Sequence, residues 1–374
     1  MPGKLSLYIA RRFLQTVLGT FLVVFLLIVT LDLVELIRSN TPGIARFGDL
    51  VGMALLHAPS MTITAAPFIM LLASMTSFAM LARSSELVVT RAAGVSVWRL
   101  LMPVLVSATL LGIFAFAVYN PLASAFTAKF DTLEQRYFDR SSSRLSVSGK
   151  GLWLRQGGEE GQTVIRARQA DGTIEHLEDV TIFQFDRADG LYRRINAEKA
   201  VLGDRNWNLT NVLRWNLSDR RDADIERSMA EMQATALPEM SIPTELTAER
   251  IQDSFAPPET ISFWELPRFI ALLEDSGFSS SRHRLHWLRL AAQPVVFVAM
   301  VLIGAAFSMR HQRFGGLGYM ALATVIAGFG YFFLSDIAGA LGASGAIPVL
   351  LSGLGPPMAA VLLSLGLLLH LEDG

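Results

Sequence analysis

Residues 83–99, with the sequence RSSELVVTRAAGVSVWR, form a short basic and amphipathic segment between two long apolar runs. Arg83 and Glu86 are three residues apart, so a helix would place them on one face, and Leu87 begins an apolar side. The pattern is typical of a contact surface. Two interpretations fit it. The segment is either a cytoplasmic loop whose arginines meet anionic lipid headgroups, or a coupling helix in a groove of an ATPase, with Glu86 as its charged anchor.

The sequence contains no motif of a reaction centre. It has no GxxxxGK(S/T) phosphate cradle, no HExxH zinc motif and no nucleophile elbow. His283 and His286 are one helical turn apart, but arginines flank them and no carboxylate is placed to complete a metal site, so we expect a structural role at the membrane interface. Because there is no cysteine, disulfides and thiolate metal sites within the chain are excluded.

Ionisable residues are also few in the apolar runs. His57 lies inside a run, whereas Asp32 and Asp336 lie next to the ends of runs. A proton-coupled transporter carries carboxylates or histidines at mid-membrane depth. We therefore expect the energy for any transport to come from a separate subunit. The chain itself should carry no cofactor and no enzymatic activity, with ATP and Mg in a partner ATPase. Nucleic acid is not expected as a partner.

The charge distribution predicts membrane spans. Only 17% of the 374 residues are charged, against about 25% in a soluble domain. A helix that crosses a bilayer needs about 20 apolar residues, and six charge-free runs meet this length. Pro59 and Pro67 predict a kink in the second, and glycines break the last, leaving a final span at 349–370. The runs are Phe13–Leu31, Val51–Ala82, Leu100–Phe126, Leu290–Met309, Gly315–Leu334 and Ile337–Leu369.

Positive charge in short loops predicts the orientation. Lys4, Arg11 and Arg12 place the N-terminus in the cytoplasm, and alternation then places segment 83–99 and the C-terminus there as well. Three arginines do not fit, because they fall at the outer end of the fourth run. Either the positive-inside rule does not apply to these arginines, because they lie next to a large translocated domain, or they contact anionic headgroups from the outer side. These are Arg282, Arg284 and Arg289.

A β domain is predicted at residues 127–260, between spans 1–126 and 287–374, with a helix and linker at 261–286. Short alternating stretches separated by Gly-containing turns favour a sandwich or jelly roll. Pro238 and Pro243 are interpreted as part of the return to the membrane, and 263–275 as an amphipathic helix. The predicted strands are Gly151–Arg155, Thr163–Arg168, Val180–Asp186, Leu191–Leu202, Trp207–Trp215 and Ile225–Gln233.

Residues 80–96, MLARSSELVVTRAAGVS, closely resemble the coupling segment of the lipopolysaccharide-export ABC transporter permeases of the LptF/LptG type. The form SELVV and the element GLWLR at 151–155 are more like the G-type subunit. Weaker similarities extend along most of the chain. They are found at Gly277, Arg282, Gln293-Pro294, Asp336, Gly342 and Ile347-Pro348.

The resemblance implies six transmembrane helices, three on each side of a periplasmic β-jellyroll domain, in the bacterial inner membrane. It implies export of lipopolysaccharide to a periplasmic β-jellyroll bridge, for outer membrane biogenesis in Gram-negative cells. The implied partners are an LptF-like permease, a dimeric LptB-like ATP-binding subunit, an LptC-like membrane-anchored adaptor and an LptA-like bridge. The remaining alternative is a membrane-anchored sensor or assembly factor with a ligand-binding β domain. The implied coupling residues are Arg83, Glu86, Leu87, Arg91 and Gly94.

Such a substrate needs an apolar wall for acyl chains and a basic rim for phosphates. Family members carry lysines at the outer end of span one, whereas this chain has Asp32, Glu35 and only Arg38. Either other arginines of this chain and the partner permease also contribute to the basic rim, or this protein handles a lipid A whose charge differs from that of other family members' substrate. Asp32 would repel phosphate and is expected to face away from it. The candidates are Arg38, Arg136, Arg282 and Arg284 for phosphate, and Phe25, Phe329 and Phe332 for acyl chains.

Overall fold

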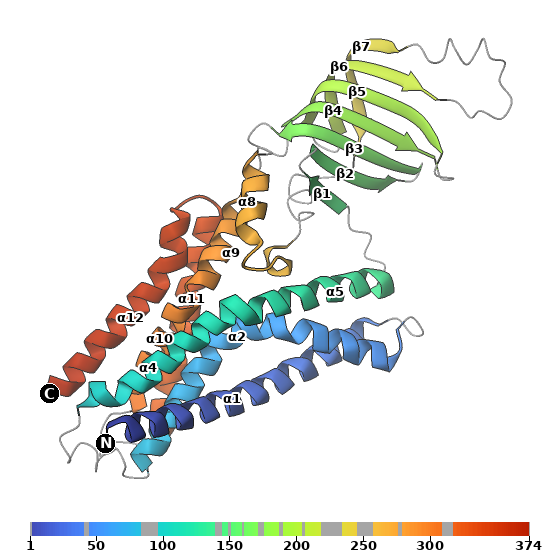
Figure 1. Cartoon of the computed structure of the whole chain (residues 1–374). Helices are drawn as coiled ribbons and strands as arrows, with labels where there is room; N and C mark the ends of the chain where they lie inside the picture. Colours follow the sequence, from blue (N-terminus) through green and yellow to red (C-terminus); the bar gives the residue numbers. More distant parts are fainter. Residues whose placement is uncertain are drawn as a thin grey trace. The chain divides into compact units, whose positions relative to one another are not determined.

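The computed structural model divides the chain into two compact units (Figure 1). A helical unit comprises Met1–Asp139, Glu259–Leu266 and Ser281–Gly374, and a β unit comprises Arg140–Pro258 and Pro267–Ser280. Each unit is described by itself. The structure describes residues 2–40, 45–83, 96–138, 144–148, 151–158, 161–170, 176–186, 190–203, 206–217, 234–244, 257–275, 279–308 and 317–373.

The helical unit contains long apolar helices that correspond to the charge-free runs of the sequence. Five described helices or continuous helical stretches are each long and apolar enough to cross a membrane, and α9 with α10 passes the same test only as a pair bent by 53°. The predicted count of six therefore holds only if this bent pair is one span. The helices are α1 Pro2–Ser39, α2 Phe47–Arg83, α4 Val97–Phe114, the π-helical turn η1 Ala115–Tyr119, α5 Asn120–Phe138, α9 Ser281–Ala291, α10 Gln293–Ser308, α11 Leu317–Ala343 and α12 Val349–Asp373.

The third stretch is continuous through α4, η1 and α5, so Val97–Phe138 forms one 42-residue helical element. In α2, both Pro59 and Pro67 lie inside a single helix, whose ribbon changes direction along its length in Figure 1. Proline removes a backbone hydrogen bond and kinks a helix that continues through it. The second charge-free run is thus a bent helix, in agreement with the prediction.

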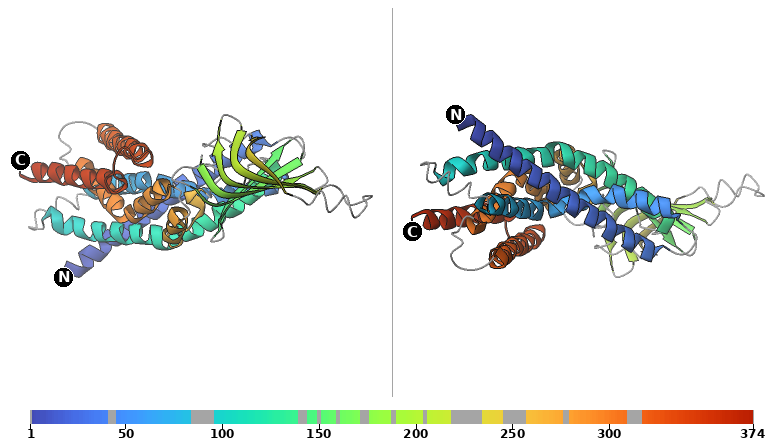
Figure 2. Two further views of the ribbon diagram at one scale, coloured as in Figure 1. Left: turned by 90° about the horizontal axis from the view of Figure 1, so that it is seen from above. Right: turned by 90° about the horizontal axis from the view of Figure 1, so that it is seen from below.

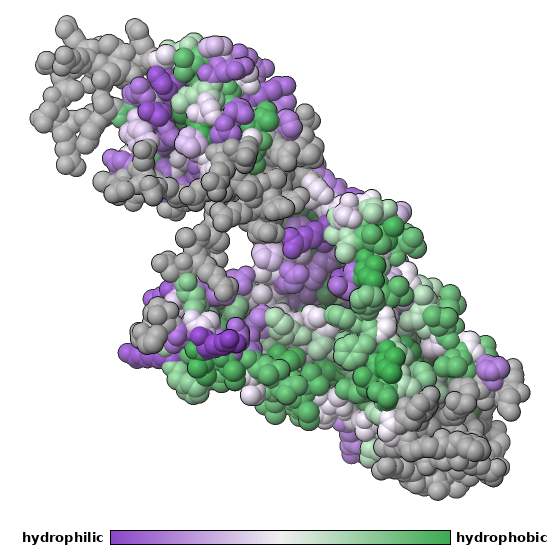
Figure 3. All heavy atoms as spheres, turned by 180° about the vertical axis from the view of Figure 1, so that it is seen from behind, coloured by the Kyte–Doolittle hydropathy of each residue, from purple (hydrophilic) through white to green (hydrophobic). Residues whose placement is uncertain are grey.

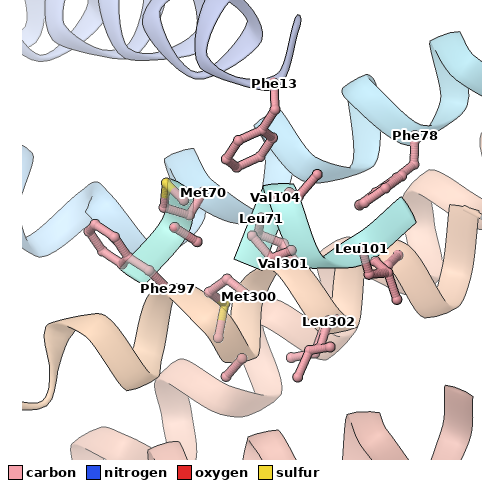
Figure 4. Packing of buried hydrophobic residues seen from close by; sticks show 14 of the residues in the cluster. Phe13, Met70, Leu71, Phe78, Leu101, Val104, Phe297, Met300, Val301 and Leu302 are labelled. Atoms are coloured by element: carbon pink, nitrogen blue, oxygen red, sulfur yellow. The ribbon is translucent and has the colours of Figure 1, made fainter. Parts of the chain in front are cut away.

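Helix α10 is the centre of the helical unit. Twelve of its 16 residues are buried, as expected for a helix that is apolar on all sides. It packs against α2, α4 and α12, and Figure 2 shows α1, α2 and the α4–α5 stretch running side by side. Buried side chains from these helices interdigitate around it (Figure 4). The labelled members are Phe13, Met70, Leu71, Phe78, Leu101, Val104, Phe297, Met300, Val301 and Leu302.

The β unit is one antiparallel sheet of seven described strands in the order β1-β2-β3-β4-β5-β6-β7. A β domain was predicted, as a sandwich or jelly roll, and its β character is confirmed. The strand order is that of a meander and differs from the crossed order of a Greek-key jelly roll, because most connections are too short to cross over. The strands are β1 Arg144–Ser148, β2 Gly151–Gly158, β3 Gly161–Ala170, β4 His176–Phe185, β5 Leu191–Leu202, β6 Asn206–Asn216 and β7 Thr235–Pro243.

Strand β7 corrects the sequence prediction at its C-terminal side. Pro238 and Pro243 lie within this strand and were wrongly interpreted as the return to the membrane. The physical reason is that β7 is the outermost of the described strands on its side of the sheet, where a missing N–H does not interrupt a ladder on both sides. The strand predicted at 225–233 lies outside the described residues.

One face of the sheet encloses an apolar core that is completed by α8 Leu266–Asp275. Leu273 of α8 is buried in this core, and Phe269 packs against it. The amphipathic helix predicted at 263–275 is therefore present, begins three residues later and belongs to the β unit through most of its length.

The largest fully buried side chain of this core, Trp207, is 0% exposed. We expect Trp207→Ala to destabilise the β unit by about 3–5 kcal/mol, because it leaves a cavity under the sheet. Trp153→Ala is the matched control, since Trp153 is 36% exposed and the Arg166 guanidinium lies over its ring at 5.5 Å; a loss of about 1 kcal/mol or less is expected. Hydrogen exchange of β4–β6 in the full chain measures both. Equal protection in the two variants would contradict the assignment of the core.

Candidate lipid-facing site

The outer surface of the helical unit is apolar over several helices, as the broad green area of Figure 3 shows. Long aliphatic and aromatic side chains of α1, α11 and α12 are exposed. Soluble proteins rarely expose contiguous apolar patches above a few hundred Å², so this surface meets lipid or another apolar chain. Examples are Leu22, Val23, Leu26, Leu31, Ile326, Phe333, Leu350 and Leu363.

Two of the three acyl-chain candidates gather at the junction of α2 and α11. The ring of Phe68 lies 5.3 Å from that of Phe329 and 5.8 Å from that of Phe332, centroid to centroid. Phe329 is 60% exposed and Phe332 is 43% exposed, so this aromatic face remains open to a ligand. Phe68 was not among the residues predicted from the sequence, although its position directly after Pro67 in a charge-free run was an available signal.

Phe25 lies in a different environment. Its ring stacks on Phe21 of the same helix at 5.8 Å, and Phe21 in turn meets Tyr119 edge-on at 6.3 Å. The structure therefore does not bring all three predicted aromatics together. One group lies on α2 and α11, and the other on α1 and η1.

Two of the phosphate candidates lie at one end of a three-helix cluster. Leu36 of α1, Met53 of α2 and Phe130 of α5 pack together there. Arg38 and Arg136 are exposed in the last turns of α1 and α5, which end on the same side of the helical unit in Figure 1. An exposed guanidinium at a helix end suits an anionic group.

The arginines of α9 separate into two kinds. Arg282 and Arg284 are exposed, whereas Arg289 is partly buried and its Nη2 donates to the Ser335 carbonyl oxygen of α11 at 2.7 Å. Arg289 therefore connects helices within the unit. Of the three arginines that violate the charge rule, Arg282 and Arg284 are therefore the exposed ones.

Asp32 and His57 form an interhelical pair that sequence reasoning did not foresee. Asp32 Oδ1 lies 2.9 Å from His57 Nδ1, and each side chain is 18% exposed. The His57 ring also stacks on Phe130 at 4.3 Å, which ties α1 and α2 to α5. Asp32 is thus paired within the protein, and its expected orientation away from phosphate stays a prediction.

We expect a double-mutant cycle of Asp32→Ala and His57→Ala to give a coupling energy of about 1 kcal/mol. The pair is largely shielded from water, which strengthens the contact, but hydrogen-bonded pairs in membrane proteins contribute only modest interaction energies. Unfolding of each variant in mild detergent measures it. Glu35→Ala, an exposed carboxylate on the same helix, combined with His57→Ala should be additive. An additive Asp32–His57 cycle would show that the contact contributes nothing.

The coupling residues predicted from sequence lie almost wholly outside the described residues. Glu86, Leu87, Arg91 and Gly94 are not described, and Arg83 is the last residue of α2. On the other side, Ser96 caps α4 by accepting a hydrogen bond from the Arg99 N–H at 3.4 Å. The segment therefore connects two long apolar helices, and its roles stay predictions.

Long apolar helices around a buried central helix, together with a β unit between α5 and α9 in the chain, define a polytopic membrane protein with an inserted β domain. The chain belongs to the family described as lipopolysaccharide export system permease LptF/LptG, whose model matches residues 7–370.

Its relatives include the lipopolysaccharide export system permease protein LptG of Haemophilus influenzae, 23% identical over 380 residues that cover 100% of both chains. The protein of the same name from Escherichia coli (strain K12) is 23% identical over 375 residues, 98% of each chain. Both names agree with the resemblance to the G-type subunit noted in the sequence.

Proposed function

We propose that this chain is the LptG-like permease subunit of an ABC transporter that extracts lipopolysaccharide from the inner membrane and passes it to a periplasmic β bridge. The observation that carries the proposal is the family match over residues 7–370, which spans both the apolar helices and the β unit. The identity of the lipid as lipopolysaccharide is taken from the description of the family. The exposed aromatic face of α2 and α11 is a surface suited to its acyl chains.

The energy comes from a separate, dimeric ATP-binding subunit, because this sequence carries no phosphate cradle. Segment 83–99 transmits the movement of the ATP-binding subunit to the helices on either side of the segment, with Glu86 as the charged anchor. ATP-driven closure of that subunit narrows a cavity between this chain and a second permease of the same family. Lipid is then squeezed toward the β domain.

The positive-inside rule supports cytoplasmic N- and C-termini, which make the β domain periplasmic. In this orientation, Arg38, Arg136, Arg282 and Arg284 are candidates for the phosphate groups at the outer leaflet. Among the strands that the structure describes, β1 and β7 are the outermost two of the sheet. An edge strand offers unpaired backbone groups for strand addition, and we assign this contact to the LptC-like adaptor or the LptA-like bridge.

The acyl-chain role predicts that the double variant Phe329→Ala and Phe332→Ala lowers export about tenfold, because two rings beside Phe68 lose apolar contact with the lipid worth on the order of 1.4 kcal/mol. ATP-dependent release of lipopolysaccharide from proteoliposomes of the whole transporter measures it. Phe333→Ala is the matched control, since Phe333 is 68% exposed on the same helix. An equal loss in the control would refute a specific role for the pair.

A further inference from the structure

A π-helical turn, η1, interrupts the helical stretch Val97–Phe138 shortly before Pro121. In a regular α-helix the N–H of residue 121 would donate to the Ala117 carbonyl oxygen, but proline has no N–H and its ring clashes with that carbonyl. In the structure the Asn120 N–H donates to the carbonyl oxygen of Ala115, five residues back, which widens the turn. Pro121 therefore accounts for the π turn and deprives the Ala117 carbonyl of its α-helical donor.

Trp264 supplies a donor for this carbonyl from another part of the helical unit. Its indole Nε1 donates to the Ala117 carbonyl oxygen at 3.1 Å. The preceding residue adds two contacts, because the Phe263 N–H donates to Asn120 Oδ1 at 2.8 Å and the Phe263 ring lies 4.8 Å from that of Phe116. Phe263 is 7% exposed and Trp264 is 63% exposed. Phe263 is thus a buried anchor, whereas the Trp264 hydrogen bond lies at the surface, where it opens more readily.

The two arms of this helical stretch, α4 and α5, pack in separate clusters. Helix α4 contributes Leu101 and Val104 to the central cluster around α10 (Figure 4). Helix α5 contributes Phe130 to the three-helix cluster, together with Leu36 and Met53. None of the five residues of η1, all of which the structure describes, is buried. Bending at η1 therefore disturbs little of the packing of either cluster.

The other two helices that join these clusters are also loosely held between them. In α2, Pro59 and Pro67 lie between the residues that pack in the three-helix cluster and those that pack in the central cluster. Helix α1 is unbroken, but no residue between Phe13 and Leu36, a range that the structure describes in full, is buried. An apolar pocket of about 420 Å³ lies between α1, α2 and η1 at this level. Close packing, which would resist a shift of one cluster against the other, is therefore weak here.

We propose that η1 is a hinge between the central cluster and the three-helix cluster, and that the hydrogen bond from Trp264 to Ala117 is the latch that holds this hinge. With the bond made, α5 is held at one angle to α4. With the bond open, η1 bends, α2 yields at its prolines and α1 pivots as a rigid helix. The hinge does not depend on the proposed function, because neither a lipid nor an ATPase takes part in it.

The latch lies where the chain leaves the helical unit. Trp264 is followed by Glu265 and Leu266, and residues 267–280 belong to the β unit. The state of the hinge is thus set two residues before the chain enters the β unit.

The hinge is tested by distance measurement on the full chain in lipid nanodiscs. The chain has no cysteine, so Met102→Cys on α4 and Lys129→Cys on α5 carry the only two spin labels. Both positions are exposed, and they would lie about 40 Å apart along a straight helix, within the range of double electron–electron resonance. We expect one narrow distance distribution for the latched protein and a broader one for the Trp264→Phe variant.

Trp264→Phe keeps an aromatic ring but removes the N–H. Hydrogen exchange of residues 262–266 and of η1 should become about threefold to tenfold faster, the effect of one neutral hydrogen bond on the opening equilibrium. Trp287→Phe is the matched control, because within the described residues the Nε1 of Trp287 has no hydrogen-bond partner, so neither the exchange nor the distances should change. A Trp264→Phe variant that behaves like the control in both measurements would overturn the latch.

Pro121→Ala returns an N–H that can donate to the Ala117 carbonyl oxygen in a regular α-helix. We expect one narrow distance distribution, displaced from that of the unaltered protein because the π turn is lost. In this background Trp264→Phe should have no further effect, since both donors serve the same acceptor. Unchanged distances in Pro121→Ala would overturn the hinge, and a full additional effect of Trp264→Phe would overturn Ala117 as the shared acceptor. Thermal unfolding checks that each variant folds.

Discussion

We expect the replacement of Glu86 by lysine to abolish lipopolysaccharide export. Glu86 is the one acidic residue in segment 83–99, among three arginines. If it anchors the segment in a groove of the ATPase, Glu86→Lys removes one favourable charge contact and introduces a repulsive one. Losing one partner of a buried interfacial charge pair costs about 2–5 kcal/mol, which weakens the association at least about thirtyfold. Co-purification of the ATPase and ATP-dependent lipid release measure the effect.

The matched control is Glu265→Lys, which makes the same charge reversal at an exposed position of the helical unit. It should leave both quantities unchanged. Glu86→Gln should give an intermediate loss, because the amide keeps some hydrogen-bonding capacity without the charge. Normal export in the Glu86→Lys variant would remove Glu86 from the coupling role and leave the segment as a lipid-facing loop.

We expect the replacement of Gly112 by valine to prevent the helical unit from folding. The first atom of any side chain at this position would lie 2.4 Å from the Cα and 2.7 Å from the N of Pro294. The obstacle is backbone, which cannot rotate away as a side chain can. Overpacking of a core costs about 1–3 kcal/mol and more where nothing can shift, and α10 is the central helix of the unit. The yield of monodisperse protein in detergent should fall to near zero.

Gly19→Val is the control for this prediction. Gly19 is also inside an apolar helix, but nothing lies within 4 Å of a Cβ built there, so only the small difference in helix propensity is expected. Gly112→Ala should be intermediate. A Gly112→Val protein that is as abundant and as stable as the Gly19→Val protein would show that α4 and α10 are not in backbone contact.

The long helices could be predicted because the absence of charge over about 20 residues is a strong local signal. The bent pair was the exception. Helix α9, SRHRLHWLRLA, carries three arginines, so the charge-free criterion did not include it in a span. Only the folded structure shows that Arg289 is directed inward to the Ser335 carbonyl. A charge with an internal partner is tolerated where an isolated one is not.

In the β unit, turn signals located five of the strands, because Gly-containing turns and alternating side chains are local features. Strand β7 was missed because its prolines normally exclude a strand, and only its place at the sheet edge permits them. The contacts of the candidate site could not be predicted in the same way. The Asp32–His57 pair and the Phe68–Phe329 contact join different helices, and no local pattern encodes which helices pack together.

The most direct test of the proposed function is transfer by the reconstituted transporter. The chain is purified with its bound partners from native membrane, placed in liposomes that contain lipopolysaccharide, and supplied with ATP and the soluble β-bridge protein. The proposed function predicts ATP-dependent appearance of lipopolysaccharide on the bridge, lost in the Glu86→Lys variant. A chain that carries no ATPase and transfers no lipid, while its β domain still binds a ligand, would contradict it and indicate a membrane-anchored sensor.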